Sequence, residues 1–527
     1  MPEQNLAPNP DHYLVSANGR LGESPQSKVT EVARILDLSI QQAPENGLVI
    51  HFHGGLVSRD YALENITALL TDRYARAKAY PLFFVWESGF KEAILNNKKD
   101  LLRDPAFREL VKKVSEWVLK KVSITGGVSF KGAGGQAIAD EDQFRQEYDR
   151  WFADARDVPP VEDSDIAGNA GAKTRAASGE PDIDLLANEV ELQLDNDPQF
   201  KEVMQETFNA ANPPGVDVST KGVGTRKRAD VLLLSSDALD ELFPPEEGAS
   251  RADGKVKTRG LFTWAKVAYY VAKLVIEVVK RFRSDRDHGV YCTVIEEVLR
   301  SAYGDLIGAA VWNAMKKDTL DSFAAGPDTC GLLVVQKLKA LEDAGKRFKK
   351  VTLVGHSTGA IYICNFLDAA KAAGLVTPIY VVFLAPAVTC ERFAAALDTH
   401  ESTFLKDFRM FAMRDAREIE DQMLKPFYTR SLLYFVSGVL EGNVTGGKWK
   451  GTLDMPLVGM ERFFMVGAFC DDEKVQKVWK FLNARPHRMV WSKAEGAGAG
   501  LNSDSQHHGD FDNDDPTLKS LVEIISA

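Results

Sequence analysis

A five-residue stretch ending at Gly359 places a serine in a setting suited to nucleophilic catalysis. The stretch is Gly-His-Ser-Thr-Gly, with Ser357 at its centre, His356 before it and Thr358 after it. In a G-x-S-x-G turn between a strand and a helix, the serine backbone is strained, so small residues are needed two positions before and after it. Gly355 and Gly359 fill these positions. The pattern predicts a hydroxyl that attacks an acyl carbonyl.

A second glycine-containing turn lies far upstream, where the apolar run 47–52 continues into His53-Gly54-Gly55-Leu56. A strand that ends in His-Gly-Gly is where serine hydrolases of the α/β type provide a backbone amide for the oxyanion. We therefore expect the amide of Gly55 or Leu56 to act together with the amide of Thr358. The alternative is an ordinary strand-to-helix turn that uses glycine for its conformational freedom.

A polar loop near the C-terminus contains two adjacent histidines. His508, which is followed by glycine, is the expected general base, and His507 is the alternative. A histidine in a loop after the final strand can reach back over a nucleophile. The same loop could instead bind a metal ion through its histidines and Asp510, Asp512 and Asp514, but an acidic loop without paired ligand spacing is more typical of a solvated segment.

The carboxylate that would orient the base is expected just after the strand-like run 404–413. All catalytic groups must project from one edge of the sheet, and Asp415 follows that run directly. Three further acids are nearby rivals, Glu418, Glu420 and Asp421. The alternative is a charged helix start, where acids favour the positive end of the helix dipole.

The elements needed to position these groups alternate along the chain. Apolar runs predict further strands at 80–86, 348–354, 377–384 and 487–491, and helical spacing of apolar residues predicts helices at 28–42, 58–74, 328–345, 475–482 and 516–525. Strands that alternate with helices pair in parallel through right-handed crossovers. We therefore expect an α/β fold with a mostly parallel sheet flanked by helices.

The strand–helix alternation is interrupted by a long insertion. We expect an N-terminal arm at 1–27, a first core part at 28–90, a mainly helical insertion at 91–325 and a second core part at 326–527. Within the insertion, segments rich in Pro, Gly and polar residues predict loops at 158–182, 212–228 and 244–257.

The most apolar helix of the insertion is expected at 260–283. Its lysines and one glutamate form a single polar stripe, and most of its other residues are apolar. Such a helix is most often a core helix. It could also be a cap helix that lines an acyl-binding pocket, or an amphipathic helix that lies in a membrane interface.

Composition excludes several classes of protein. The chain has 527 residues and a formal net charge of −11, which argues against general binding of nucleic acid. No secretory leader and no apolar run long enough to cross a bilayer is expected. The five cysteines are odd in number and widely spaced, so we expect reduced thiols and a cytoplasmic protein. They are Cys292, Cys330, Cys364, Cys390 and Cys470.

The order Ser357, Asp415, His508, preceded by the His53-Gly54-Gly55 turn, resembles the α/β-hydrolase superfamily in its lipase and esterase-like branch. The resemblance covers 28–87 and 327–527; Leu56 stands where a third glycine would be, and the insertion resembles a cap or lid in position.

This resemblance implies that the chain hydrolyses a small-molecule acyl ester through an acyl-enzyme, with a catalytic triad and an oxyanion hole and with no metal or organic cofactor. One alternative is a phospholipase or lipase that acts at a membrane surface. The other is a non-catalytic signalling or interaction protein with a hydrolase fold.

Overall fold

The computed structural model describes most of the chain. The described residues are 8–42, 44–86, 100–126, 130–131, 137–138, 182–211, 233–243, 262–304, 309–401, 405–422, 427–441, 454–465, 469 and 471–527. The loops expected at 158–182, 212–228 and 244–257 lie almost entirely outside these ranges.

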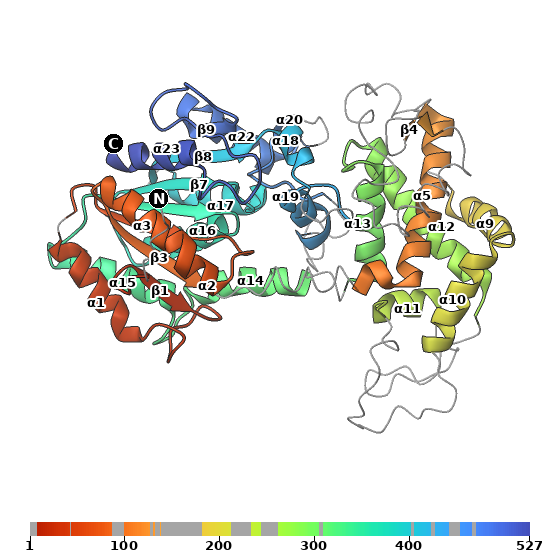
Figure 1. Cartoon of the computed structure of the whole chain (residues 1–527), viewed down its shortest axis with the longest axis horizontal. Coiled ribbons are helices and arrows are strands. Elements are labelled where there is room, and N and C mark those ends of the chain that lie inside the picture. The colour runs from red at the N-terminus through yellow and green to blue at the C-terminus, as the bar shows by residue number, and fades with distance from the viewer. Residues whose placement is uncertain are drawn as a thin grey trace, which may run out of the picture.

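The core is a seven-stranded sheet in which every neighbouring pair of strands is parallel, in the order β1-β3-β2-β6-β7-β8-β9 (Figure 1). The predicted α/β class and the predicted strands are confirmed. The strands are β1 (Tyr13–Ser16), β2 (Leu48–Phe52), β3 (Tyr80–Trp86), β6 (Val351–His356), β7 (Ile379–Leu384), β8 (Leu405–Met413) and β9 (Met489–Ser492).

The edge strand β1 is a correction to the expected arm at 1–27. Residues 13–16 pair with the end of β3 along their whole length, so this part of the arm belongs to the sheet. The strand is only four residues long and is preceded by polar sequence, which gives too few apolar positions for a periodicity to be recognised.

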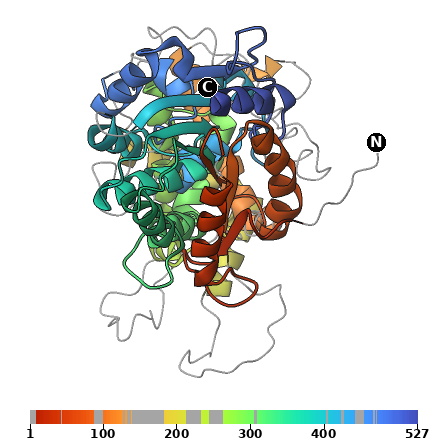
Figure 2. The same cartoon turned by 90° about the vertical axis from the view of Figure 1, so that its left-hand side faces the viewer.

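The strands are apolar on both faces because helices cover both faces (Figure 2). Along β2, Ile50 belongs to one buried cluster and its neighbour Val49 to the other. The helices that belong to the first cluster are α1 (Val29–Gln41), α15 (Cys330–Asp343), α16 (Gly359–Ala372), α17 (Cys390–His400) and α22 (Glu473–Asn483). Those of the second are α3 (Ala68–Arg76) and α23 (Asp515–Ser526), with α3 preceded by α2 (Arg59–Tyr61) and the π-helix Ala62–Thr67.

Between β3 and β6 the chain leaves the sheet and forms a group of helices, drawn at the right of Figure 1. They are α5 (Pro105–Gly126), α9 (Ile183–Leu194), α10 (Pro198–Ala211), α11 (Ser236–Leu242), α12 (Trp264–Arg283) and α13 (Val290–Ala302), followed by α14 (Ala309–Asp321), which runs back toward the sheet. A short antiparallel pair, β4 (Phe130–Lys131) and β5 (Ala137–Ile138), completes the described part.

The apolar helix expected at 260–283 is α12, and it is a core helix. It packs against α9, α5 and α13, and Val271 at its centre is fully buried. Trp264 at its start is partly buried. Its apolar surface therefore faces the other helices of the insertion rather than a membrane.

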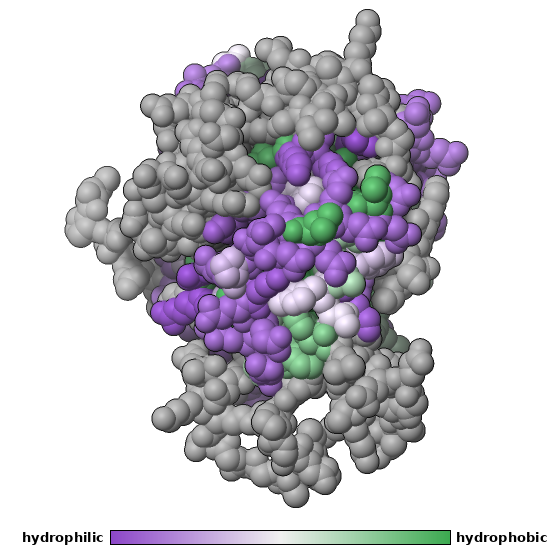
Figure 3. All heavy atoms as spheres, turned by 90° about the vertical axis from the view of Figure 1, so that its right-hand side faces the viewer, coloured by the Kyte–Doolittle hydropathy of each residue, from purple (hydrophilic) through white to green (hydrophobic). Residues whose placement is uncertain are grey.

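The outer end of the insertion presents a mixed surface. Figure 3 shows mainly hydrophilic residues there, with apolar residues separated by polar ones. Exposed apolar side chains on these helices include Leu185, Leu192 and Tyr269. Among the described helices, none combines the length and the apolar character needed to cross a bilayer.

After β8 the chain forms short elements that lie between the sheet and the insertion (Figure 1). They are α18 (Asp415–Glu420), α19 (Leu432–Phe435), the π-helix Val436–Leu440 and α20 (Arg462–Met465), and a 3-10 turn at Pro486–Arg488 precedes β9. The four described cysteines, at positions 292, 330, 364 and 390, are buried and are not joined to one another by disulfide bonds.

Candidate active site

Ser357 occupies the sharp turn between β6 and α16, and its backbone φ is +53°. A non-glycine residue with positive φ is strained, and such strain concentrates at functional sites. The flanking glycines are required by crowding. A Cβ on Gly355 would lie 2.7 Å from the carbonyl carbon of Gly359, and a Cβ on Gly359 would overlap the carbonyl oxygen of Phe52. The predicted strained turn with obligatory small residues is confirmed.

The Gly54-Gly55 turn packs directly against this serine turn. A Cβ on Gly54 would be 3.3 Å from the Cβ of Ser357, and a Cβ on Gly55 would be 2.8 Å from Oγ1 of Thr358. The partly buried Leu56 follows in the same turn. The structure therefore brings together the two backbone segments that were expected to share an oxyanion.

His53 holds the glycine turn in place as a neutral side chain. Its Nε2 accepts a hydrogen bond from the backbone amide of Trp86 at 3.2 Å, so Nδ1 carries the proton and donates to the carbonyl oxygen of Gly54 at 2.9 Å. Burial lowers the pKa of His53 to about 4. The ring also stacks on the indole of Trp86, with centroids 5.6 Å apart. Packing and hydrogen bonds together fix the turn.

The loop that carries His508 reaches the serine turn through His356. Nε2 of His356 donates to the backbone oxygen of His508 at 2.8 Å, and the two imidazole rings stack with centroids 5.3 Å apart. Neither ring nitrogen of His508 has a hydrogen-bond partner within the described part of the chain, so no hydrogen bond joins it to Ser357 or to an acid. Burial, and next the charge of His356, lower the pKa of His508 to about 3. The ring is therefore neutral and able to accept a proton.

Asp415 lies at the first turn of α18, at the carboxyl end of β8 as expected. Its Oδ1 accepts a hydrogen bond from the hydroxyl of Tyr434 at 2.7 Å, and its backbone amide donates to Oε2 of Glu461 at 3.0 Å. The contacts described for Asp415 are thus directed toward α19 and the segment before α20 rather than toward His508.

A different acid contacts the histidine loop. Oδ2 of Asp421 accepts a hydrogen bond from the backbone amide of His508 at 2.7 Å, and Oδ1 accepts one from Nδ1 of His507 at 2.9 Å. Glu418 is fully buried, and burial raises its pKa well above its ordinary value against the opposing effect of Ser431. Burial therefore disfavours the charged form of Glu418, whereas Asp421 is the rival acid that touches the loop.

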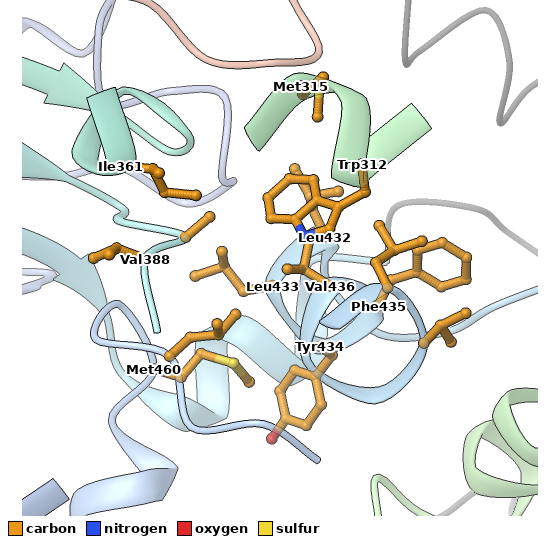
Figure 4. Close-up of a cluster of buried hydrophobic side chains, with 14 of the residues drawn as sticks. Trp312, Met315, Ile361, Val388, Leu432, Leu433, Tyr434, Phe435, Val436 and Met460 are labelled. Atoms are coloured by element: carbon orange, nitrogen blue, oxygen red, sulfur yellow. The ribbon is translucent and has the colours of Figure 1, made fainter. Parts of the chain in front are cut away.

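Figure 4 shows a cluster of buried apolar side chains contributed by several elements near the carboxyl edge of the sheet. Met315 of α14 approaches the glycine turn so closely that a Cβ on Gly55 would be 2.9 Å from its sulfur. Ile361 of α16, one turn after the serine, and Val388, which follows β7, belong to the same cluster. Residues of the insertion, of the serine helix and of the α19 segment therefore meet in one cluster that reaches the Gly54-Gly55 turn through Met315. The other labelled members are Trp312, Leu432, Leu433, Tyr434, Phe435, Val436 and Met460.

Sequence reasoning missed one pair of site residues. Nδ1 of His356 lies 3.2 Å from Oδ2 of Asp512, and both side chains are buried. Asp512 was considered only as a metal ligand. The position of His356 immediately before the serine could have drawn attention to it, but the pairing depends on how the histidine loop folds. The described residues contain no group of three or more His, Cys, Asp or Glu side chains arranged to hold a metal ion.

In comparisons with known proteins, no family model matches the chain, and no significant match was found among the curated proteins or the solved structures. The fold and the site define a parallel α/β protein with a strained, glycine-flanked serine at the carboxyl edge of its sheet.

Proposed function

We propose that this protein is a serine hydrolase that cleaves carboxylic esters through an acyl-enzyme. One observation carries the proposal: the strained Ser357 lies where the Gly54-Gly55 turn packs against it and where the His508 loop bonds to the adjacent His356. Strain at a serine, two convergent backbone segments and a neutral buried imidazole are the parts that acyl transfer needs. The strand order, with a glycine turn on the strand beside the serine strand, is consistent with an α/β-hydrolase sheet.

In this mechanism, Ser357 Oγ attacks the ester carbonyl while His508 removes the hydroxyl proton. The developing oxyanion accepts hydrogen bonds from the amide of Thr358 and from that of Gly55 or Leu56, near the positive end of α16. The imidazolium then protonates the leaving alcohol. Water, deprotonated by His508, attacks the acyl-enzyme and releases the acid. The mechanism requires the ring nitrogens of His508, which have no partner within the described residues, to bond to Ser357 and to an acid when substrate binds.

For the acid, the contacts favour Asp421 over the expected Asp415. Asp421 accepts hydrogen bonds from the backbone amide of His508 and from Nδ1 of His507, so it already contacts the loop that carries the proposed base. Asp415 remains the alternative, because it lies at the end of β8 and its hydrogen bond to Tyr434 is exchangeable.

Labelling with a fluorophosphonate tests the proposal directly. The folded protein should form a covalent adduct at Ser357, and Ser357→Ala should abolish it, because the reagent needs a serine activated by a base and an oxyanion site. Ser437→Ala is the matched control, since Ser437 is buried but lies in the π-helix 436–440. No adduct, or one that persists in Ser357→Ala, would favour the non-catalytic alternative.

The apolar cluster that reaches the Gly54-Gly55 turn predicts a preference for apolar acyl groups, with α14 acting as part of a cap. Each buried methylene is worth about 0.8 kcal/mol, which corresponds to a gain of roughly fourfold in kcat/KM per carbon until the site is filled. Hydrolysis of p-nitrophenyl esters from acetyl to palmitoyl measures this directly. Equal rates at all chain lengths would contradict an acyl site in the cluster, and no hydrolysis of any ester would redirect the search to amides, thioesters or lactones.

A further inference from the structure

His356 has an acceptor at each of its two ring nitrogens. Nδ1 faces the carboxylate of Asp512 at 3.2 Å, and Nε2 faces the backbone oxygen of His508 at 2.8 Å. Neither a carboxylate nor a carbonyl oxygen can donate, so both nitrogens of His356 must donate. An imidazole that donates from both nitrogens is the charged imidazolium.

This charged ring connects the serine strand to the loop of the proposed base. His356 is the last residue of β6 and directly precedes Ser357, while both of its partners belong to the loop after β9. The ring also stacks on that of His508. We name these contacts of His356 with Asp512 and His508 the His356 bridge.

We propose that the His356 bridge positions His508 over Ser357 only while His356 is protonated, which makes His356 a positioning residue that sets the alkaline limit of activity. The proposal rests on the proposed hydrolase function. When His356 loses a proton, one nitrogen becomes an acceptor facing another acceptor. Either the bond to Asp512 or the bond to the His508 carbonyl is then lost, and the loop is held to the serine strand by one hydrogen bond instead of two.

The surrounding charges agree with this assignment. Burial alone would lower the pKa of His356, but the charge and hydrogen bond of Asp512, with the His508 carbonyl and Asp510, raise it above its ordinary value. Burial alone would raise the pKa of Asp512, but the charge and hydrogen bond of His356 lower it.

The other titratable groups near the bridge are neutral. Burial lowers the pKa of His51, on β2, to about 3. Burial likewise lowers the pKa of His53 on the same strand and raises that of Tyr74, the α3 residue bonded to His51. His508 itself is neutral, as described above. The charges that act on His356 to raise its pKa are therefore those of Asp512 and Asp510, both in the histidine loop.

The pH dependence follows from the raised pKa. A group whose pKa is raised in the folded protein stabilises the folded arrangement while it is protonated. This stabilisation is lost as the pH rises through the pKa of the folded protein. We expect kcat/KM to fall on the alkaline side at a pH above 6.5, the ordinary value for histidine. The acidic limb would belong to His508.

Two substitutions and a control test the bridge. His356→Gln keeps one donor and removes the titration, so the alkaline limb should disappear, and kcat should fall by up to about 100-fold as the base becomes misplaced. Asp512→Asn keeps the shape but removes the charge, so the limb should move to lower pH by about one to three units. His400→Gln removes a different buried histidine, paired with Asp368 at 2.7 Å, and should leave the limb where it is. A limb unchanged in both bridge variants would overturn the proposal.

NMR titration of the histidine rings separates this proposal from the hydrolase function. His356, assigned by its absence in His356→Gln, should carry protons on both nitrogens at pH 6.5 and titrate above that pH in the wild-type protein. If the fluorophosphonate does not label Ser357 but His356 titrates in this way, the protonated His356 bridge is supported and the proposed hydrolase function is contradicted. If His356 is neutral at pH 6.5, the bridge is wrong whatever the protein hydrolyses.

Discussion

Asp421→Asn is expected to lower turnover of a p-nitrophenyl ester by about 10,000-fold while leaving the fold intact. An amide in place of a triad carboxylate can hold the histidine in the wrong tautomer and cannot stabilise the imidazolium, and a loss of this size follows. The remaining oxygen of the asparagine can still accept the backbone amide of His508, which is bonded to Asp421 at 2.7 Å. The loop should therefore keep its place, and the loss should appear in kcat.

Asp415→Asn and Glu418→Gln are the matched variants. Asp415 bonds to Tyr434 rather than to the histidine loop, so its amide should change turnover by no more than about tenfold. Burial raises the pKa of Glu418 and disfavours its carboxylate form, so the neutral amide of Glu418→Gln should have little effect. A 10,000-fold loss in Asp415→Asn with a small effect in Asp421→Asn would instead make Asp415 the acid, as its position after β8 predicts.

The strands and the serine turn could be predicted because their determinants are local. The segment from Val351 to Gly359 contains a β-branched run, which predicts the strand, and then a serine between two glycines. Strand and helix crowd together at both glycines, as the spacing predicts. The Gly54-Gly55 turn was predictable for the same reason, and parallel pairing of β2 with β6 brought it to the serine.

The contacts that Asp421 and His356 make with the histidine loop could not be predicted, because they depend on how separate loops meet. Asp421 and His508 are separated by 87 positions, and His356 and Asp512 by 156, and neither pair lies within a periodic element. The position of Asp415 directly after β8 made it the expected acid. That position fixes only the edge of the sheet at which the side chain lies, and not the loop that it contacts. Which acid turns toward the histidine loop is set by the short helix α18 and the chain after it.

A buried charge network joins the insertion to the segment after β8. Glu296 of α13 accepts hydrogen bonds from Arg281 at 2.6 Å and Tyr428 at 2.5 Å, and its Oε1 lies 2.7 Å from Nδ1 of His288. The other ring nitrogen of His288 lies 2.6 Å from Asp454. In the π-helix, Gly438 leaves the room that the carboxylate needs, since a Cβ there would overlap it.

The same network continues toward the candidate site. Arg462 forms an ion pair with Asp454 at 3.1 Å and lies against the hydroxyl of Tyr434, which bonds to Asp415. The helices of the insertion are therefore connected, through buried polar contacts, to the start of α18. Loss of one charge at the centre of this network should loosen the attachment of the insertion as well as lower stability.

Glu296→Gln is accordingly expected to lower the free energy of unfolding by about 3–5 kcal/mol at pH 7, because it leaves Arg281 and His288 buried with too little negative charge. Urea unfolding followed by tryptophan fluorescence measures the change. Glu241→Gln, which removes an exposed ion pair with Lys273 between α11 and α12, is the control and should cost about 0–1 kcal/mol.

The pH dependence of this difference identifies the charge as its cause. Burial alone would raise the pKa of Glu296, but the charges of His288 and Arg281 lower it to about 2. A carboxylate with a lowered folded pKa stabilises the protein above its ordinary value and loses that contribution as the pH falls toward the folded one. The gap between wild type and Glu296→Gln should therefore be full at pH 7 and shrink between about pH 4.5 and pH 2. A gap that stays constant over that range would assign the loss to packing rather than to the charge network.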